Sequence, residues 1–446
     1  MTQVYAADHV LPVGARPVRR GAVAVVDGLI VAVGPRDEVL AGFPGCTVEE
    51  LGEAALLPAL VNAHTHLEYA QYGGFGDGLE FGAWLGDHVA RRPRQEAGDA
   101  ARAARLGAAL SLRSGVGTVA DASYSGVAVE AVREAGLRGV VHLEAFGGPE
   151  ADPAQVASQV RERLAALASS CSPLVRLGIS PHSPYTVAPA VFAALAGVAH
   201  DEGLTQMTHV AESPAELEAV AHGTGPIAEA LQALTRIEAT GLHPVDLLAR
   251  GGLLRTGMIL VHAVQLDDHH IATIAASGAA VVHCPRSNAN LGCGAAPLVQ
   301  LLAAGVPVGL GTDSPASAID FDLWAELRAA LLAARIRESR SDALTAEAAI
   351  ELATSGGAHA LGLGAQIGRL EAGLRADLTA IDLRGSPLAP VEDPAVAAVY
   401  AGSPERTLLT VVDGVVRYRK GTDEQRIAAL VAAAASGRAR MMGPQD

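Results

Sequence analysis

The sequence has almost no lysine. Lys420 is the only one among 446 residues, and it lies far along the chain beside a predicted strand end. An enzyme that forms a Schiff base, or a two-metal site bridged by a carboxylated lysine, needs a lysine inside its active site. The near absence of lysine therefore argues against both classes.

The sequence also lacks an excess of positive charge. Lysine and arginine together number 33 against 48 aspartates and glutamates, which gives a formal net charge of −15, and no basic run stands out. Nucleic acids and anionic membrane surfaces are bound through clustered basic side chains. Neither is expected as a partner of this protein.

Features of membrane and secreted proteins are missing as well. No apolar run approaches the length of a bilayer span, and the first residues show no basic region followed by an apolar one. The four cysteines have neither zinc-finger nor disulfide-framework spacing and are expected to be reduced: Cys46, Cys171, Cys284 and Cys293. Together these absences predict a soluble, cytoplasmic protein.

Both ends of the chain carry strand signals. Between residues 4 and 57, short β-branched runs alternate with turn dipeptides such as Asp27-Gly28, which predicts a small antiparallel sheet. Strand signals return at 377–382 and 406–417, before an expected helix at 424–438. We expect residues 1–57 and 365–446 to form one discontinuous β-sandwich domain.

The middle of the chain alternates strand and helix patterns. Eight predicted strands cover 58–64, 116–121, 137–145, 174–181, 204–210, 257–262, 278–283 and 306–312. Helical runs are expected near 94–114, 126–135, 153–169, 187–202, 213–239, 267–276, 296–304, 320–336 and 343–360. This order predicts an α/β fold in which a (β/α)8 TIM barrel, residues 58–364, is inserted into the small domain. A doubly wound open sheet is the alternative, but no Gly-x-Gly-x-x-Gly turn follows a strand.

Unusual polar residues fall at the ends of the predicted strands. His64 and His66 end the first strand, one residue apart, so that both side chains lie on one face. The other strand-end residues are His182, His209, His262, His283 and Asp313. Reactive groups of a (β/α)8 barrel lie at the carboxyl ends of its strands, so these side chains are expected to converge.

Four of these residues have the chemistry of a catalytic metal site. His64, His66, His209 and Asp313 offer three imidazoles and one carboxylate, which leaves room for a water molecule. A bound metal lowers the pKa of such a water toward neutrality. Zinc is favoured, with Fe2+ as the alternative.

The remaining strand-end residues suggest catalytic and substrate-binding roles. Glu212, three residues after His209, can carry a proton to a substrate nitrogen. His262 is expected to orient the attacking water, and Asp313 to act as a proton acceptor besides binding the metal. His182 and His283 are expected to contact the substrate.

These motifs resemble the amidohydrolase superfamily, in its branch of aromatic-amine deaminases and chlorohydrolases. The matching segments are His64-x-His66, His209-Val-Ala-Glu212, His262, His283-Cys-Pro-x-Ser-Asn288 and Gly311-Thr-Asp313-Ser. The resemblance implies one divalent metal, an enzyme that hydrolyses C–N bonds other than peptide bonds, and a homodimer. The His-x-Glu and Pro-Cys-x-x-Cys signature of the cytidine deaminase fold is absent.

Within this branch, Ser180-Pro-His182-Ser-Pro-Tyr-Thr186 resembles deaminases of S-adenosylhomocysteine, methylthioadenosine or aminodeoxyfutalosine. Three further segments are similar to the aminodeoxyfutalosine group: His66-Leu-Glu68-Tyr, Phe81-Gly-Ala-Trp84 and Arg91-Arg92. This similarity implies a role in menaquinone biosynthesis. We therefore expect a metal-dependent deaminase that releases ammonia from a 6-aminopurine nucleoside.

Several substrate-binding assignments have two interpretations. Arg91 or Arg92 could pair with a substrate carboxylate, or both could form a solvated charge cluster. Glu68 could contact ribose hydroxyls or support the metal ligands, and Trp84 could stack on a purine or anchor its loop.

Two other functions fit the same residues less well. A related hydrolase would act on guanine or on a chlorinated or triazine-type ring. A barrel that serves only as a non-catalytic scaffold usually lacks several metal ligands, whereas all four are present here.

Overall fold

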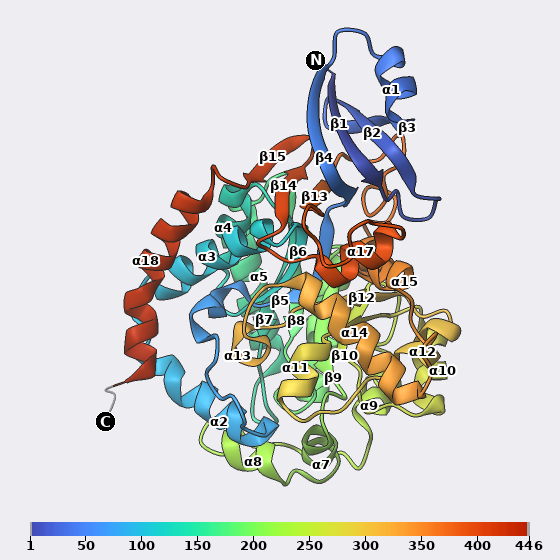
Figure 1. Cartoon of the computed structure of the whole chain (residues 1–446). Helices are drawn as coiled ribbons and strands as arrows, with labels where there is room; N and C mark the ends of the chain where they lie inside the picture. Colours follow the sequence, from blue (N-terminus) through green and yellow to red (C-terminus); the bar gives the residue numbers. More distant parts are fainter. Residues whose placement is uncertain (1, 444–446) are drawn as a thin grey trace.

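The computed structural model describes residues 2–443. Its larger part is an eight-stranded sheet whose strands pair in parallel in chain order (Figure 1). These strands are β5 (Leu60–Thr65), β6 (Val116–Ser123), β7 (Arg138–Ala145), β8 (Val175–Pro181), β9 (Gln206–Val210), β10 (Met258–His262), β11 (Ala280–His283) and β12 (Val308–Leu310). A parallel bridge from Thr65 to Asp313 joins the first strand to the segment after the last. The predicted barrel is confirmed.

The barrel strands consist mainly of apolar residues, which suits their position, since side chains pack against both faces of each strand. On the inside, Val61, Met207, Ile259 and Val282 form one cluster with Leu361. On the outside the strands pack against helices α3 (Asp99–Arg113), α4 (Ala128–Ala135), α5 (Pro153–Leu167), α6 (Pro189–Asp201), α10 (Asp268–Ser277), α12 (Leu298–Ala303) and α14 (Leu323–Glu338). This double burial explains the near-continuous apolar runs that identified the strands in the sequence.

The expected helix at 213–239 is wrong as a single element. The structure has α7 (Pro214–His222) and α8 (Pro226–Leu231), followed by α9 (Pro244–Arg250). Gly223 ends α7 in the left-handed conformation, with φ of 68°, and Pro226 begins the next helix. Glycine at a helix C-terminus and proline in a first turn are ordinary stop and start signals.

Short helices lie at the carboxyl ends of the strands. They are α2 (Phe81–Arg91), α11 (Pro285–Asn290) and α13 (Pro315–Ala318), with 3-10 turns at Leu67–Tyr72 and Arg92–Arg94. A further 3-10 turn, Ala168–Ser170, follows α5 and leads into the start of β8. The expected helix at 343–360 is present as α15 (Ala346–Glu351) and α16 (Gly357–Ala360), joined by a π-helical turn, Leu352–Gly356. Among residues 2–443, no helix is long and apolar enough to cross a membrane.

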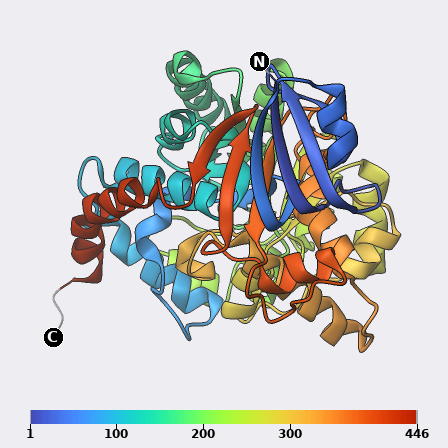
Figure 2. The same cartoon turned by 45° about the horizontal axis from the view of Figure 1, so that its top comes forward.

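Both chain ends build a second sheet, as predicted. It contains β1 (Gln3–Val10), β2 (Val18–Val26), β3 (Leu29–Pro35), β4 (Thr47–Pro58), β13 (Leu378–Asp382), β14 (Thr407–Val412) and β15 (Val415–Arg419). The order is β15-β14-β13-β4-β1-β2-β3, and Figure 2 shows the red C-terminal strands beside the blue N-terminal ones. The expectation of a purely antiparallel N-terminal sheet is wrong, because β1 pairs with β4 in parallel.

This sheet curls over its own apolar face. The edge strand β3 meets the segment before β13, where the Ile30 N–H donates to the Leu374 carbonyl at 2.9 Å. Tyr5, Val23, Leu56 and Leu378 lie in the enclosed core. The contact between β3 and the segment before β13 thus helps to enclose the core of the small domain.

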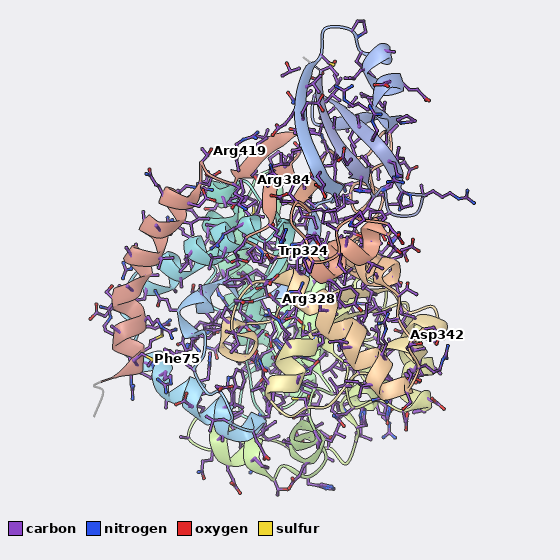
Figure 3. The ribbon with its side chains drawn as sticks, in the orientation of Figure 1. Phe75, Trp324, Arg328, Asp342, Arg384 and Arg419 are labelled. Carbon is purple, nitrogen blue, oxygen red and sulfur yellow. The ribbon has the colours of Figure 1, made fainter. Side chains whose placement is uncertain are left out.

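Three helices complete the part built from the chain ends. They are α1 (Arg36–Gly42), α17 (Pro394–Ala401) and α18 (Glu424–Met442), and α18 runs beside α3 at one side of the barrel (Figure 1). Figure 3 shows Trp324 and Arg328 of α14 near α17. Trp324 is fully buried, and the Arg328 guanidinium donates to the carbonyls of Val399 and Gly402 at 3.1 and 2.7 Å. Side chains of the last barrel helix therefore hold the returning chain.

A buried ion pair also joins the two parts. Arg138, at the start of β7, donates to both carboxylate oxygens of Asp377, just before β13, at 2.8 and 3.0 Å. Both side chains are at most 5% exposed, and the Asp413 N–H also donates to Asp377. Asp377→Ala removes both hydrogen bonds to the buried guanidinium and leaves it only a longer contact with Asp413 at 3.6 Å. We therefore expect the free energy of unfolding to fall by about 3 kcal/mol, measured by urea denaturation.

The matched control is Glu134→Ala, which breaks the exposed pair between Arg105 and Glu134. A change of at most about 1 kcal/mol is expected there. Equal losses in the two variants would contradict a special role for the buried pair.

Candidate active site

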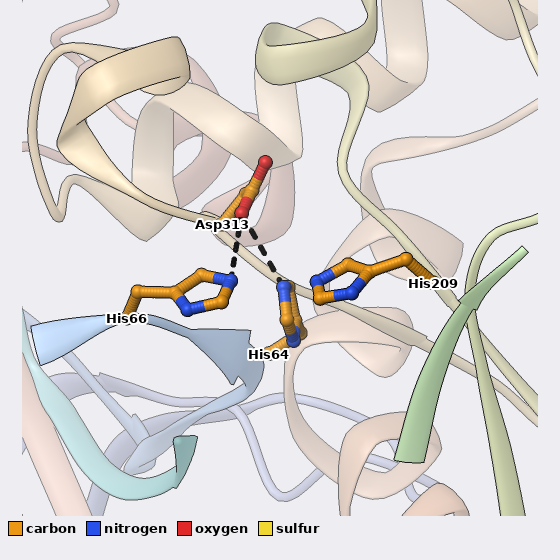
Figure 4. A group of neighbouring side chains, drawn as sticks. All are labelled: His64, His66, His209 and Asp313. Carbon is orange, nitrogen blue, oxygen red and sulfur yellow. Dashed lines mark ion pairs between the residues drawn. The ribbon is translucent and has the colours of Figure 1, made fainter. Parts of the chain in front are cut away.

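Four side chains from three distant segments converge at the carboxyl ends of the strands. His64 and His66 come from the end of β5, His209 from β9, and Asp313 from the residues after β12 (Figure 4). One potential ligand atom from each lies within 4.8 Å of the other three, and all four residues are buried. The structure thus brings together the four residues predicted to bind a metal.

The spacing of these atoms fits a single metal ion. Oδ1 of Asp313 lies 3.3 Å from Nε2 of His64 and 3.4 Å from Nε2 of His66. Ligand atoms that are each about 2.0–2.2 Å from one metal ion lie about 3–4 Å from one another. Nε2 of His64 is also buried without a hydrogen-bond partner. The donor set and its spacing therefore suit a divalent cation.

Neighbouring groups fix the orientation of the ligands. Nδ1 of His209 donates to the main-chain carbonyl of His182 at 2.8 Å, which leaves Nε2 free to face the site. The other oxygen of Asp313, Oδ2, accepts hydrogen bonds from the hydroxyls of Ser287 and Ser317 at 2.6 and 2.9 Å. Support of this kind holds a metal ligand in one rotamer.

The approach of Asp313 to the first strand depends on the residues beside it. The Asp313 N–H donates to the His64 carbonyl at 3.1 Å, and Asp313 has a positive φ of 57°. A Cβ atom on Gly311 would lie 2.8 Å from the main-chain oxygen of His64 and 2.9 Å from its nitrogen. Only glycine allows the backbones to come this close, which explains the glycine of the Gly311-Thr-Asp313 motif.

Burial favours the neutral form of three imidazoles of the site. It is the main cause that lowers the pKa of His209 to about 4 and the pKa values of His66 and His262 well below the usual range. A neutral imidazole has the free electron pair that a metal requires. Burial by itself would raise the pKa of the Asp313 carboxyl. Contact with His64 and the proximity of His262 instead hold this pKa well below its usual range.

Glu212 and His262 lie together beside the ligands. Oε1 of Glu212 is 3.5 Å from Nε2 of His262, and the Asn288 amide donates to the opposite nitrogen of His262, Nδ1, at 3.0 Å. With Nδ1 accepting, the ring carries its proton on Nε2, which faces the site. Burial, followed by the charge of Asp313, raises the pKa of Glu212 well above its usual range.

The main chain around Glu212 is held by a second carboxylate. Fully buried Glu216 accepts the N–H groups of Ala211 and Glu212 at 2.9 and 2.7 Å. Ala211 has a φ of 51°, an unfavourable conformation for alanine. Glu216, which the sequence did not single out, thus stabilises the turn that presents Glu212.

A cavity of about 480 Å³ opens onto these residues. Its lining includes His66, His209, Glu212, His262 and Asp313. Of the predicted substrate-binding residues, His182, Trp84 and Arg92 also line it. The indole N–H of Trp84 donates to the Ala316 carbonyl at 3.0 Å, so this residue is anchored while it faces the cavity.

Three other predicted substrate-binding residues do not line the cavity. Arg91 turns away, donating to Asp87 at 2.6 Å and to the Met441 carbonyl at 3.0 Å. Glu68 accepts hydrogen bonds from Ser123 and from the Ser125 N–H. His283 ends β11, where it is 2% exposed.

The cavity also contains residues that the sequence did not single out. They include His88 on α2, Tyr124 and Phe146 at its opening, and Glu144 near the end of β7. Glu144 could have been found, since it falls at the end of the strand expected at 137–145. His88 gave no comparable signal, because α2 was not expected as a helix.

Comparison with known proteins agrees with this geometry. Residues 55–417 match the model of the Amidohydrolase family, and residues 21–45 match a bacterial imidazolonepropionase-like composite domain. A 5-methylthioadenosine/S-adenosylhomocysteine deaminase of Nitratidesulfovibrio vulgaris is 34% identical over 406 residues, which cover 90% of this chain and 88% of that protein. The same enzyme of Moorella thermoacetica is 32% identical, covering 92% and 93%.

Solved structures give the same result for the fold. An adenosine deaminase of Xanthomonas campestris with bound zinc superposes with a TM-score of 0.86 at 29% identity, covering 99% of both chains. Atrazine chlorohydrolase of Arthrobacter aurescens has a TM-score of 0.83 at 24% identity, covering 98% of this chain and 100% of that one. The strand-end motifs, the metal-ligand geometry and these matches together show that the chain belongs to the amidohydrolase family and is a metal-dependent hydrolase that acts on C–N bonds.

Proposed function

We propose that this protein is a hydrolytic deaminase that releases ammonia from an adenosine-like 6-aminopurine nucleoside. The observation that carries the proposal is the meeting of His64, His66, His209 and Asp313 with Glu212 and His262 at one end of the cavity. Relatives at 32–34% identity that span nearly the whole chain are named as deaminases of methylthioadenosine and S-adenosylhomocysteine. The identity of the substrate follows from neither observation alone.

The carboxyl groups of Glu212 and Asp313 fit the roles of general acid and general base. When bound, a divalent metal supplies an activated water as the nucleophile. Glu212, whose pKa is raised by burial, keeps a proton that it can donate to the ring nitrogen next to the reacting carbon. Asp313, whose pKa is lowered, accepts one proton of the water and passes it to the departing amine. The proton left on the new C–OH group returns Glu212 to its protonated form. His262 directs its Nε2–H toward the same space and orients the attacking oxygen.

The cavity suits a planar base with an attached polar group. Phe81, Trp84 and Leu85 supply apolar walls, and His182 stacks on Phe146 with 4.8 Å between ring centroids. Its volume of about 480 Å³ lies within the range of small-molecule sites. Because His182 lies next to His209, we assign it a contact with the substrate close to the reacting ring.

Arg92 supports a substrate that carries a carboxylate. Its guanidinium lies 3.1 Å from the ring centroid of Tyr124 and lines the cavity, and within residues 2–443 it forms no hydrogen bond or ion pair. Such a guanidinium suits the benzoate of aminodeoxyfutalosine or the amino-acid carboxylate of S-adenosylhomocysteine, whereas methylthioadenosine has no carboxylate. We favour aminodeoxyfutalosine because the segments around Glu68 and Trp84 are similar to that group. If aminodeoxyfutalosine is the substrate, the enzyme takes part in menaquinone biosynthesis.

The alternative substrates are a chlorinated triazine and guanine. The triazine would release chloride, whereas guanine would release ammonia, as the proposed substrate does. The triazine-hydrolysing structures are 24–25% identical in sequence to this chain. Guanine deaminase from E. coli is 19% identical in sequence, with a TM-score of 0.78. At these identities the likeness concerns the fold, so neither substrate is preferred.

Zinc is our proposal for the metal, with Fe2+ as the alternative, because the same nitrogen and oxygen ligands accept both ions. A homodimer and a cytoplasmic location are further predictions of the same assignment. Sedimentation of the purified protein tests the first of these.

Removal of the metal should abolish activity. We expect about one zinc or iron ion per chain by elemental analysis, complete loss of ammonia release after chelation, and recovery when Zn2+ is restored. A protein that binds no stoichiometric metal even after reconstitution would instead support the non-catalytic scaffold.

The substitution Glu212→Gln should separate metal binding from proton transfer. Because Glu212 is not among the four ligands, metal content should stay the same, whereas kcat should fall by about 10²–10⁴-fold with the loss of the proton donor. The matched control is Glu229→Gln on the exposed face of α8, which should be unchanged. Near-normal turnover of the Glu212 variant would refute the proposed role.

A substrate panel should identify the natural reaction. Ammonia release from aminodeoxyfutalosine, S-adenosylhomocysteine, methylthioadenosine, adenosine and guanine is compared with chloride release from a chlorotriazine. For aminodeoxyfutalosine, Arg92→Ala should raise KM about 10-fold or more, whereas Arg91→Ala should have little effect on KM. An unchanged KM in the Arg92 variant would exclude this arginine as the carboxylate partner.

A further inference from the structure

A buried carboxylate in the cavity has no partner. Glu144 lies near the end of β7, is 3% exposed and lines the cavity. In the part of the chain that the structure describes, no hydrogen-bond donor reaches either of its carboxylate oxygens, and neither oxygen is shut away from the cavity. The carboxylate is therefore available to a molecule in the cavity.

Most other carboxylates around the site are satisfied by the protein. Glu212, which also lacks a hydrogen-bond donor among residues 2–443, lies 3.5 Å from His262 and is the proposed proton donor. Asp313 accepts from Ser287 and Ser317, Glu216 accepts from two main-chain N–H groups, and Glu68 accepts from Ser123 and Ser125. A buried carboxylate without a donor is costly, because it has given up its water without replacement, and burial accordingly raises the pKa of Glu144 well above its usual range. Besides Glu212, which the reaction uses, Glu144 is a buried carboxyl group of the cavity that no protein donor satisfies among residues 2–443, and this points to a ligand.

The surroundings of Glu144 exclude a second metal ion as that ligand. One of its oxygens lies within 4.8 Å of a ring nitrogen of His182 and of His209. However, Nδ1 of His209 already donates to the His182 carbonyl, and its other nitrogen belongs to the four-ligand group. In His182, Nδ1 contacts the hydroxyls of Ser183 and Thr186. Too few free donor atoms remain for a separate cation.

We propose that Glu144 accepts hydrogen bonds from the sugar hydroxyls of the nucleoside substrate. This inference rests on the proposed deaminase function. A 9-substituted adenine carries its only N–H donors on the exocyclic amine, and that amine must face Glu212 and Asp313 for the reaction to occur. The donors left for a carboxylate elsewhere in the cavity are the hydroxyls of the sugar. Glu144 would then be a substrate-binding residue that selects ribosides.

The position of Glu144 is consistent with this role. It stands beside His182, which we place next to the reacting ring, so a sugar attached to that ring comes within its reach. Arg92 lies in the same cavity and forms no ion pair with Glu144 among residues 2–443. The cavity thus offers one acceptor for hydroxyls and one cation for a distal anionic group.

The test compares adenosine, 2′-deoxyadenosine and 3′-deoxyadenosine in the metal-loaded enzyme. The wild type should prefer the riboside over at least one deoxy analogue by about 10- to 100-fold in kcat/KM. In Glu144→Ala this preference should fall to nearly one, with most of the change in KM. Glu144→Gln, which keeps one acceptor oxygen, should retain part of the preference. Glu150→Ala, an exposed residue in the connection after β7, is the matched control and should behave like the wild type.

Metal content and melting temperature show whether each variant is folded and loaded. If Glu144→Ala and Glu144→Gln are folded and discriminate ribosides as the wild type does, the assignment of Glu144 is overturned while the deaminase proposal stands. An effect confined to S-adenosylhomocysteine would overturn it too, since Glu144 would then bind an ammonium group. A wild-type enzyme that deaminates no adenine nucleoside would refute the proposed function, and this inference with it.

Discussion

The junction between the first and last strands of the barrel is the constraint on which the site depends. Asn62 and Thr312, which are 250 residues apart, exchange two hydrogen bonds: the Asn62 amide donates to the Thr312 hydroxyl at 2.8 Å, and the Thr312 N–H donates to Asn62 at 3.0 Å. The Asp313 N–H then reaches the His64 carbonyl. All of these groups are buried, so an unmade bond would leave a polar group without water. The same bonds that close the barrel set Asp313 against His64 and His66.

Several strained backbone positions lie around the site and are held by specific contacts. Ala211, His262, Ala263 and Asp313 all have positive φ angles, which cost on the order of 1–3 kcal/mol each for residues other than glycine. Glu216 holds the first of these turns through two N–H groups. The N–H of Ala263 donates to the carbonyl of Val210 at 3.1 Å, which ties the ends of β9 and β10 together. The strained turns direct side chains into the cavity, where straight strands would alternate between faces.

Electrostatics in this small volume separates the roles of two nearby carboxyl groups. Burial raises the pKa of Glu212, whereas contact with His64 and the proximity of His262 hold the pKa of Asp313 below its usual range despite the same burial. This difference is the reason that we assign proton donation to Glu212 and proton acceptance to Asp313. The cavity adds the Glu144 carboxyl group and the Arg92 guanidinium, neither of which has an ion-pair partner among residues 2–443, and we assign both to the substrate. The chemistry therefore lies at one end of the cavity, and the selection of substrate depends on the residues around it.

The sequence by itself determined the barrel, the small domain made from both chain ends, and the group of four metal-binding candidates with Glu212 and His262. It could do so because parallel strands separated by helices place all their carboxyl ends on one face, so polar residues at strand ends converge whatever the details of packing. Only the tertiary structure decided which neighbouring side chains enter the cavity. Arg91 is drawn away by Asp87 and by the Met441 carbonyl from the far end of the chain, whereas Arg92, one residue later, faces inward. Glu68 turns to Ser123, and Glu144 is left without a donor. The directions of these side chains depend on contacts with segments distant in the sequence, which local patterns do not encode.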